Sequence, residues 1–137
     1  MRKGRTIMYT KSNVNLTKRR LIQSYIDQCR RIIHDKESEN DTIGLTEDDK
    51  ICFYALAFTL KSLLYNHLER GKAVSSSQLA NDFLGISPVT LQEVFFKFKH
   101  VSINKRNTLR IINKMEQVAN DNFGTLEDMD DNDKVII

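Results

Sequence analysis

Proline, glycine and cysteine are scarce in this chain: one proline, five glycines and two cysteines stand among 137 residues, and tryptophan is absent. The longest apolar run, residues 51–58, falls far short of the roughly 20 residues that a membrane-spanning helix needs. Cys29 and Cys52 form no C-x-x-C pair and are too few for a disulfide scaffold. These absences predict a protein outside the membrane, with reduced thiols and a cytoplasmic location.

The patterns that carry catalysis or bind cofactors are missing too. His34, His67 and His100 are isolated in the sequence, and none belongs to an H-E-x-x-H pattern or to a Cys/His cluster with zinc spacing. The chain contains no glycine-rich phosphate loop and no G-x-S-x-G motif, and its acidic tail lacks the Ca²⁺-loop spacing. We therefore expect a protein that is not an enzyme and that holds no metal or cofactor.

What the chain does contain is a moderate share of apolar residues and an uneven distribution of charge. Hydrophobic residues make up 40% of the sequence and charged residues 28%, which suits one domain with a real core. Residues 1–36 hold ten Lys and Arg against two Asp, whereas residues 121–137 hold six acids and one lysine. We expect a basic, flexible arm at 1–16, a single helical domain at 17–120 and a disordered acidic tail at 121–137.

The spacing of apolar residues predicts an all-α fold of about five helices around one long helix. The expected helices span residues 17–34, 47–70, 76–83, 88 to about 100, and 104 to about 119. Thr46 and Asp49 form a capping-box pattern at the start of the long helix, and Gly71 is a favoured terminating residue after it. The polar segment 35–45, which contains Gly44, is expected to be a loop.

Two of these helices have distinctive apolar patterns. The first half of the helix expected at 47–70 is apolar on nearly every face, so we expect it to have neighbours on several sides. In the helix expected from Pro88, four residues share one side and are predicted core residues: Leu91, Val94, Phe95 and Phe98. Phe96 points the other way, and an exposed phenylalanine there would favour a protein partner.

The stretch SSSQLANDFLGISPVTLQEVFFKF has the features of two helices joined by a tight turn. Ala80 is small enough for a close helix crossing, and Gly85 can adopt a left-handed turn. Ser87 is a natural N-cap before Pro88. The stretch resembles the helix-turn-helix of many DNA-binding regulators. Four residues separate Ala80 from Gly85, one more than the usual spacing, which predicts a longer turn or a different helix crossing.

The resemblance implies a small transcriptional regulator that binds double-stranded DNA, with the helix from Pro88 in the major groove. Cations in the N-terminal arm and after the second helix would then hold phosphates. The predicted DNA-binding residues are Arg2, Lys3, Arg5, Ser87, Val89, Gln92, Lys97, Lys105, Arg106 and Arg110. A homodimer is expected, because one short recognition helix rarely gives enough specificity.

A second interpretation of the same features involves no DNA. Two helices joined at a glycine can be an ordinary helical hairpin, and charged segments can pair with each other or face solvent. The chain would then be a helical adaptor that docks on a protein of the transcription or replication machinery. Its contacts would be made through Phe96 or through the acidic tail.

Overall fold

The computed structural model describes residues 11–36, 41–68, 74–99 and 101–127, and within them it contains three long helices, two short ones and two strands. The long helices are α1 (Lys11–Asp35), α2 (Glu47–Leu68) and α5 (Lys105–Phe123). The first short helix consists of α3 (Ser76–Gln78) and the π-helical η2 (Leu79–Leu84), and the second of α4 (Pro88–Leu91) and the π-helical η3 (Gln92–Phe96). The strands are β1 (Thr42–Leu45) and β2 (Val101–Asn104). The predicted all-α fold is confirmed.

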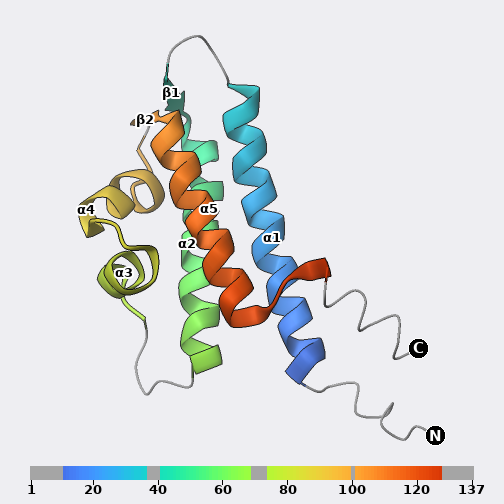
Figure 1. Ribbon diagram of the computed structural model, residues 1–137. Coiled ribbons are helices and arrows are strands. Elements are labelled where there is room, and N and C mark those ends of the chain that lie inside the picture. Colours follow the sequence, from blue (N-terminus) through green and yellow to red (C-terminus); the bar gives the residue numbers. More distant parts are fainter. Residues whose placement is uncertain (1–10, 37–40, 69–73, 100, 128–137) are drawn as a thin grey trace, which may run out of the picture.

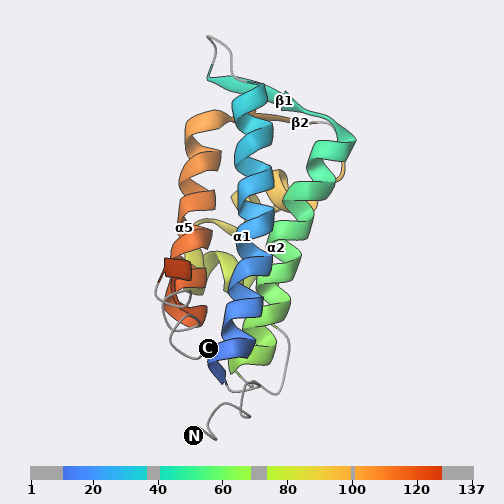
Figure 2. The same ribbon diagram turned by 90° about the vertical axis from the view of Figure 1, so that its right-hand side faces the viewer.

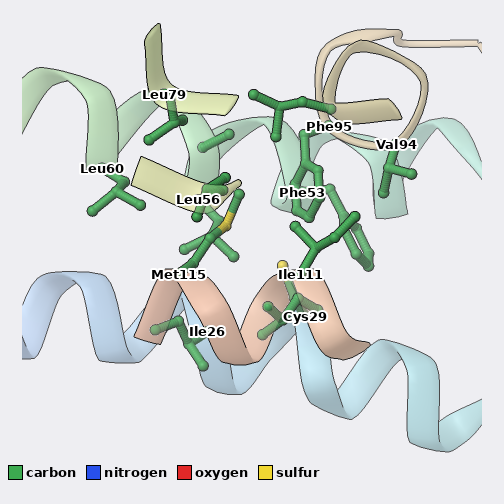
Figure 3. Close-up of a cluster of buried hydrophobic side chains, with 14 of the residues drawn as sticks. Ile26, Cys29, Phe53, Leu56, Leu60, Leu79, Val94, Phe95, Ile111 and Met115 are labelled. Atoms are coloured by element: carbon green, nitrogen blue, oxygen red, sulfur yellow. The ribbon is translucent and has the colours of Figure 1, made fainter. Parts of the chain in front are cut away.

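Helices α1, α2 and α5 lie side by side and bury one continuous core (Figures 1 and 2). Figure 3 shows side chains of all three helices meeting in this core with side chains of the short helices. Its fully buried members include Ile26, Cys29, Phe53, Leu56, Leu60 and Met115. The two short helices pack against α2 and α5, on the side opposite α1 in Figure 1.

Polar side chains tie α1 to α5 at two levels. Arg30 donates from both terminal nitrogens to the Glu116 carboxylate at 2.9 Å, and this bidentate bond lowers the pKa of Glu116. Arg19, only 3% exposed, donates from Nε and Nη2 to Asn120 Oδ1 at 3.0 and 2.7 Å. Arg19 and Arg30, two of the ten cations in residues 1–36, therefore bind other parts of the same fold.

The strands form a two-stranded antiparallel sheet at one end of the long helices (Figure 2). Thr42 pairs with Asn104 at one end of the ladder, and Leu45 pairs with Val101 at the other. Ile43 and Leu45 are buried. The prediction of a loop before α2 is wrong for its last four residues, because the alternation of exposed and buried positions there is too short to identify a strand from sequence.

The second strand also ends the helix that begins at Pro88. Helix η3 stops at Phe96, since Lys97 has extended backbone angles (φ −98°, ψ 131°) and leads toward β2. The predicted helix end near residue 100 is therefore wrong. So is the prediction that Phe98 is a core residue, because its side chain is 50% exposed. The other three predicted core residues of this helix are buried.

Helix α1 begins earlier than predicted, and helix α5 ends later than predicted. Helix α1 begins at Lys11 rather than at residue 17. Helix α5 ends at Phe123, whose side chain is 1% exposed, so the first residues after position 120 belong to the fold. Gly71, the predicted end of α2, lies outside the described residues.

The turn between the short helices has the geometry that its sequence predicts. Gly85 has a positive φ of 63°, and its amide and that of Ile86 both donate to the carbonyl of Ala80. Ser87 Oγ accepts the amide of Val89 at 3.2 Å and so caps the second helix. The wider turns of a π-helix hold one more residue than those of an α-helix, and η2 thereby takes up the additional residue between Ala80 and Gly85.

Replacing Gly85 tests how far this turn depends on a left-handed backbone. We expect Gly85→Ala to lower the free energy of unfolding by about 1 kcal/mol, because L side chains are strained at positive φ. No atom of the described residues lies within 4 Å of the position that a Cβ would take, so the cost is conformational and Gly85→Asn should be milder. Urea unfolding measures both variants, with Gly44→Ala in β1 as the control at a glycine without positive φ. Equal stability of Gly85→Ala and wild type would contradict the turn.

Candidate nucleic-acid interface

The second short helix, formed by α4 and η3, is buried on one side and open to solvent on the other (Figure 1). Leu91 and Phe95 are fully buried, and the Phe95 ring lies 5.6 Å from the ring of Phe53 on α2. On the outer side Val89 is 67% exposed. The other exposed side chains on that side include Ser87, Gln92, Glu93 and Lys97. These residues face outward.

A buried lysine fixes the end of this helix. Lys50, in the first turn of α2, is 0% exposed, and its Nζ donates to the carbonyl of Glu93 at 3.1 Å and to the carbonyl of Val94. Both carbonyls lie near the C-terminal end of the helix, where a cation is favourable. Burial lowers the pKa of Lys50 to about 8, although the Glu93 carboxylate opposes that shift. Lys50 thereby joins α2 to η3.

The outer side of the helix carries little free charge. Lys97 Nζ lies 2.7 Å from Glu93 Oε1, one turn earlier, so the two charges offset each other. Ser87 Oγ is engaged in the helix cap. Val89 and Gln92, three residues apart, supply an apolar and a hydrogen-bonding side chain on the same surface.

Cations gather on the neighbouring helix α5. Arg106 and Arg110 are exposed and one turn apart, so they project from the same side of the helix. Lys105 is half-buried, and its backbone amide donates to the carbonyl of Asp41 at 2.7 Å. The first turn of α5 contains no acidic residue, so the positive end of the helix dipole adds to these charges.

A groove separates the second short helix from β2 and the start of α5. Its volume is about 180 Å³. Thr90 and Glu93 line the wall formed by the short helix, and Asn104 and Asn107 line the opposite wall. The residues of α5 that line the groove are Asn107, Thr108 and Ile111. Arg106 and Arg110 lie on another side of the same helix, and none of the predicted DNA-binding residues is among those that line the groove.

An aromatic cluster, which we define as Tyr54, Phe58, Phe96 and Phe98, lies where η3 packs against α2. The Tyr54 ring centroid lies 5.5 Å from that of Phe58, 5.7 Å from that of Phe96 and 4.9 Å from that of Phe98. Phe96 is half-buried, with Lys61 Nζ 5.4 Å from its ring, whereas Phe58 and Phe98 are 48% and 50% exposed. The exposed phenylalanine that would favour a protein partner is therefore Phe98 rather than Phe96.

The predicted site residues fall into three groups. The outer side of the second short helix holds Ser87, Val89, Gln92 and Lys97. The start of α5 holds Lys105, Arg106 and Arg110. Arg2, Lys3 and Arg5 lie outside the described residues. The first two groups thus lie on elements that flank the groove, but their side chains are not among those that line it.

Sequence reasoning missed Lys50 and the groove residues Thr90 and Asn107. The only sequence signal for Lys50 is its position directly before a long apolar run, which is equally typical of a solvent-facing residue at a helix start. The groove depends on the pairing of β1 with β2, which the sequence did not predict.

The described residues contain neither a membrane-spanning helix nor a metal-binding cluster of side chains. Within these ranges no helix is long and apolar enough to cross a membrane, and no three His, Cys, Asp or Glu side chains lie close enough to hold a metal ion. Cys29 and Cys52 are free thiols. Comparison of the chain with protein-family models, with curated proteins and with solved structures finds no match. The geometry of the interface is therefore the basis for a functional assignment.

The buried ammonium of Lys50 makes stability depend on pH in a defined direction. Its pKa is about 8 in the folded chain, against an ordinary value of 10.5, so between these values the unfolded chain holds more protons and stability rises with pH. We expect the free energy of unfolding to rise from pH 8 to pH 10 by on the order of 1–3 kcal/mol relative to Lys50→Met. Burial raises the pKa of both thiols, which acts in the opposite direction, but it does so equally in both proteins. Urea unfolding at the two pH values measures the difference, and the same pH dependence in both proteins would contradict the buried ammonium.

Proposed function

We propose that the chain is a small DNA-binding transcriptional regulator that inserts its second short helix into the major groove of double-stranded DNA. The observation that carries the proposal is the exposed outer side of that helix, which is anchored on its inner side by Leu91, Phe95 and Lys50. A recognition helix needs both properties, because it must project into the groove and keep a fixed orientation there.

Val89 and Gln92 are suited to contact base edges. A glutamine amide can donate to and accept from adenine, and an apolar side chain can contact the methyl group of thymine. The two residues lie three positions apart on one side of the helix, so they can contact neighbouring base pairs. This combination favours a target that contains A·T pairs.

Phosphate contacts are assigned to cations that flank the helix. Arg106 and Arg110 are exposed on α5, the helix whose Asn107 lines the groove beside the short helix, and a guanidinium group binds phosphate with two parallel hydrogen bonds. The basic N-terminal arm is the second source of phosphate contacts in this proposal. Because the lysine on the helix itself is paired with a carboxylate, affinity depends on the flanking cations.

A helical adaptor that binds a protein is the second candidate. The aromatic cluster favours it, since Phe58 and Phe98 both contact Tyr54 and are both half exposed. An adaptor needs no DNA, so a DNA-binding measurement separates the two functions. A cytoplasmic location belongs to both proposals and is supported by the two free thiols.

Binding to DNA should weaken steeply as salt is added. We expect the full chain to bind a mixed-sequence duplex at low salt, with log K falling linearly against log salt concentration, because phosphate contacts release counterions. Arg106→Ala and Arg110→Ala should each flatten that slope by about 0.9. Arg31→Ala is the matched control, since Arg31 is an exposed arginine on α1. Helix α1 lies on the side of α2 and α5 opposite the short helices (Figure 1). Fluorescence anisotropy measures all four proteins, and no binding at low salt would exclude the regulator in favour of the adaptor.

Replacing Gln92 should change sequence preference rather than salt dependence. After selection of bound fragments from random DNA, we expect Gln92→Ala to bind the preferred sequence roughly 10- to 100-fold more weakly, because one bidentate base contact is lost. Its salt slope and its affinity for unrelated DNA should match those of wild type, because no phosphate contact is removed. Gln117→Ala on α5 is the control for loss of an exposed glutamine. A uniform loss of affinity on all sequences would contradict a base contact.

A further inference from the structure

One side of α2 is partly open to solvent: Glu47, Ile51 and Phe58 are exposed, whereas Tyr54, Lys61 and Tyr65 are half-buried. The exposed large hydrophobic side chains among the described residues are Leu21, Ile51, Phe58, Val89 and Phe98. Ile51 and Phe58, 52% and 48% exposed, lie on α2, and the ring of Phe98 packs against Tyr54 of the same helix. Three of the five therefore meet on one surface, and such a concentration indicates a binding surface for a protein.

The residues on this side follow the spacing of a helix–helix seam. They are Glu47, Ile51, Tyr54, Phe58, Lys61 and Tyr65, and we call them the α2 seam. Successive members are separated by four, three, four, three and four residues. Alternation of three and four is the heptad spacing with which one helix packs along another. The buried residues of α2, such as Leu56 and Leu60, lie between these positions and face the core.

The charges of the α2 seam are arranged symmetrically about Tyr54. Glu47 lies seven residues before Tyr54, and Lys61 lies seven residues after it. Glu47 and Lys61 are thus separated by about 21 Å along the helix, too far to pair within one chain. Neither forms an ion pair with another described residue, although Lys61 donates to Ser76 Oγ at 3.3 Å.

We propose that the α2 seam is the interface between two copies of this chain, packed antiparallel about a two-fold axis near Tyr54. This axis brings Glu47 of each copy to Lys61 of the other, and it brings Ile51 of each copy to Phe58 of the other. One surface is thereby used twice, as an isologous dimer requires. The acid and the base at equal distances from the centre favour a second copy over a different protein.

The expected dimer is weak. Phe96 and Phe98 widen the apolar surface beside Tyr54, but the α2 seam extends over fewer than three heptads. An interface of this size is smaller than the roughly 1,600 Å² of a standard complex, so we expect a Kd on the order of micromolar or weaker. The inference does not rest on DNA binding, because the α2 seam contains none of the predicted DNA-binding residues.

Sedimentation velocity of the full chain without DNA tests the dimer. From about 1 µM to about 1 mM we expect the mass to rise from that of the 15.9 kDa monomer toward twice that value. Phe58→Glu should keep the chain monomeric, because it places a carboxylate in the apolar centre of the interface. Leu21→Glu is the matched control, since Leu21 is 43% exposed on α1 and its replacement should leave association unchanged. Circular dichroism establishes that each variant is folded.

Charge reversal tests the antiparallel orientation. Glu47→Lys and Lys61→Glu should each weaken association by about tenfold, because each creates two like-charge pairs across the two-fold axis. The double variant restores both pairs with reversed signs, so its association constant should return to within about threefold of wild type. A structural defect in one single variant would not be repaired by the other substitution.

Three outcomes overturn the proposal. The first is a chain that stays monomeric up to about 1 mM, in which case the α2 seam is a docking site for a different protein. The second is association that survives Phe58→Glu, and the third is a double charge reversal that associates as weakly as the single variants. Because no DNA is present, none of these outcomes changes the test of the regulator.

Discussion

The contact between Lys50 and the carbonyls at the end of η3 is the constraint on which two surfaces depend: the outer side of the second short helix and the α2 seam. It fixes the start of α2 against the second short helix, and the packing of Phe53 on Phe95 extends the same contact by one turn. One flank of η3 borders the groove beside α5, and the other carries Phe96 into the aromatic cluster. An apolar residue in place of Lys50 would leave the two carbonyls without this donor, which is costly in a buried position. The bonds that Lys50 donates to these carbonyls thus offset part of the cost of burying its charge.

The π-helical segment η2 accommodates the additional residue between Ala80 and Gly85 without displacing the turn at Gly85. In an α-helix one additional residue rotates everything that follows by about 100°. Gly85 would then no longer lie where the chain reverses, and Ser87 would not be in place to cap the next helix. Because η2 is wider, the amides of Gly85 and Ile86 still reach the carbonyl of Ala80, and the second helix starts with its outer side exposed.

Local features of the fold could be predicted from the sequence, whereas features that depend on distant partners could not. The bonds between Thr46 and Asp49, at 3.0 and 3.1 Å, and the left-handed Gly85 involve only neighbouring residues, so composition and spacing identify them. The partners of Lys50 lie 43 and 44 residues away, and no pattern around it indicates them. The second short helix, formed by α4 and η3, was predicted too long because its end is set by the pairing of β2 with a strand that is distant in the sequence.

The α2 seam could not be predicted from the sequence for a different reason. The first half of α2 is apolar on nearly every face, so its exposed and buried positions are chemically alike. Ile51 and Phe53 are equally hydrophobic, yet one is 52% exposed and the other is fully buried. Of the candidate site, local spacing predicted the outer side of the second short helix, but the groove residues beside it, such as Glu93 and Asn107, are brought together by tertiary packing.

The sheet closes the chain between Thr42 and Asn104 into a loop. Each strand leads directly into a long helix, β1 into α2 through Thr46 and β2 into α5 through Asn104, so their pairing sets the two helix starts beside each other. Helices can order from local contacts, but this ladder joins segments far apart in the sequence and must first overcome the entropy of closing the loop. The wall of the groove formed by Asn104 and Asn107 is complete only when the strands have met. The groove beside the candidate interface thus depends on a pairing between distant segments, whereas the helices that flank it can form from local contacts.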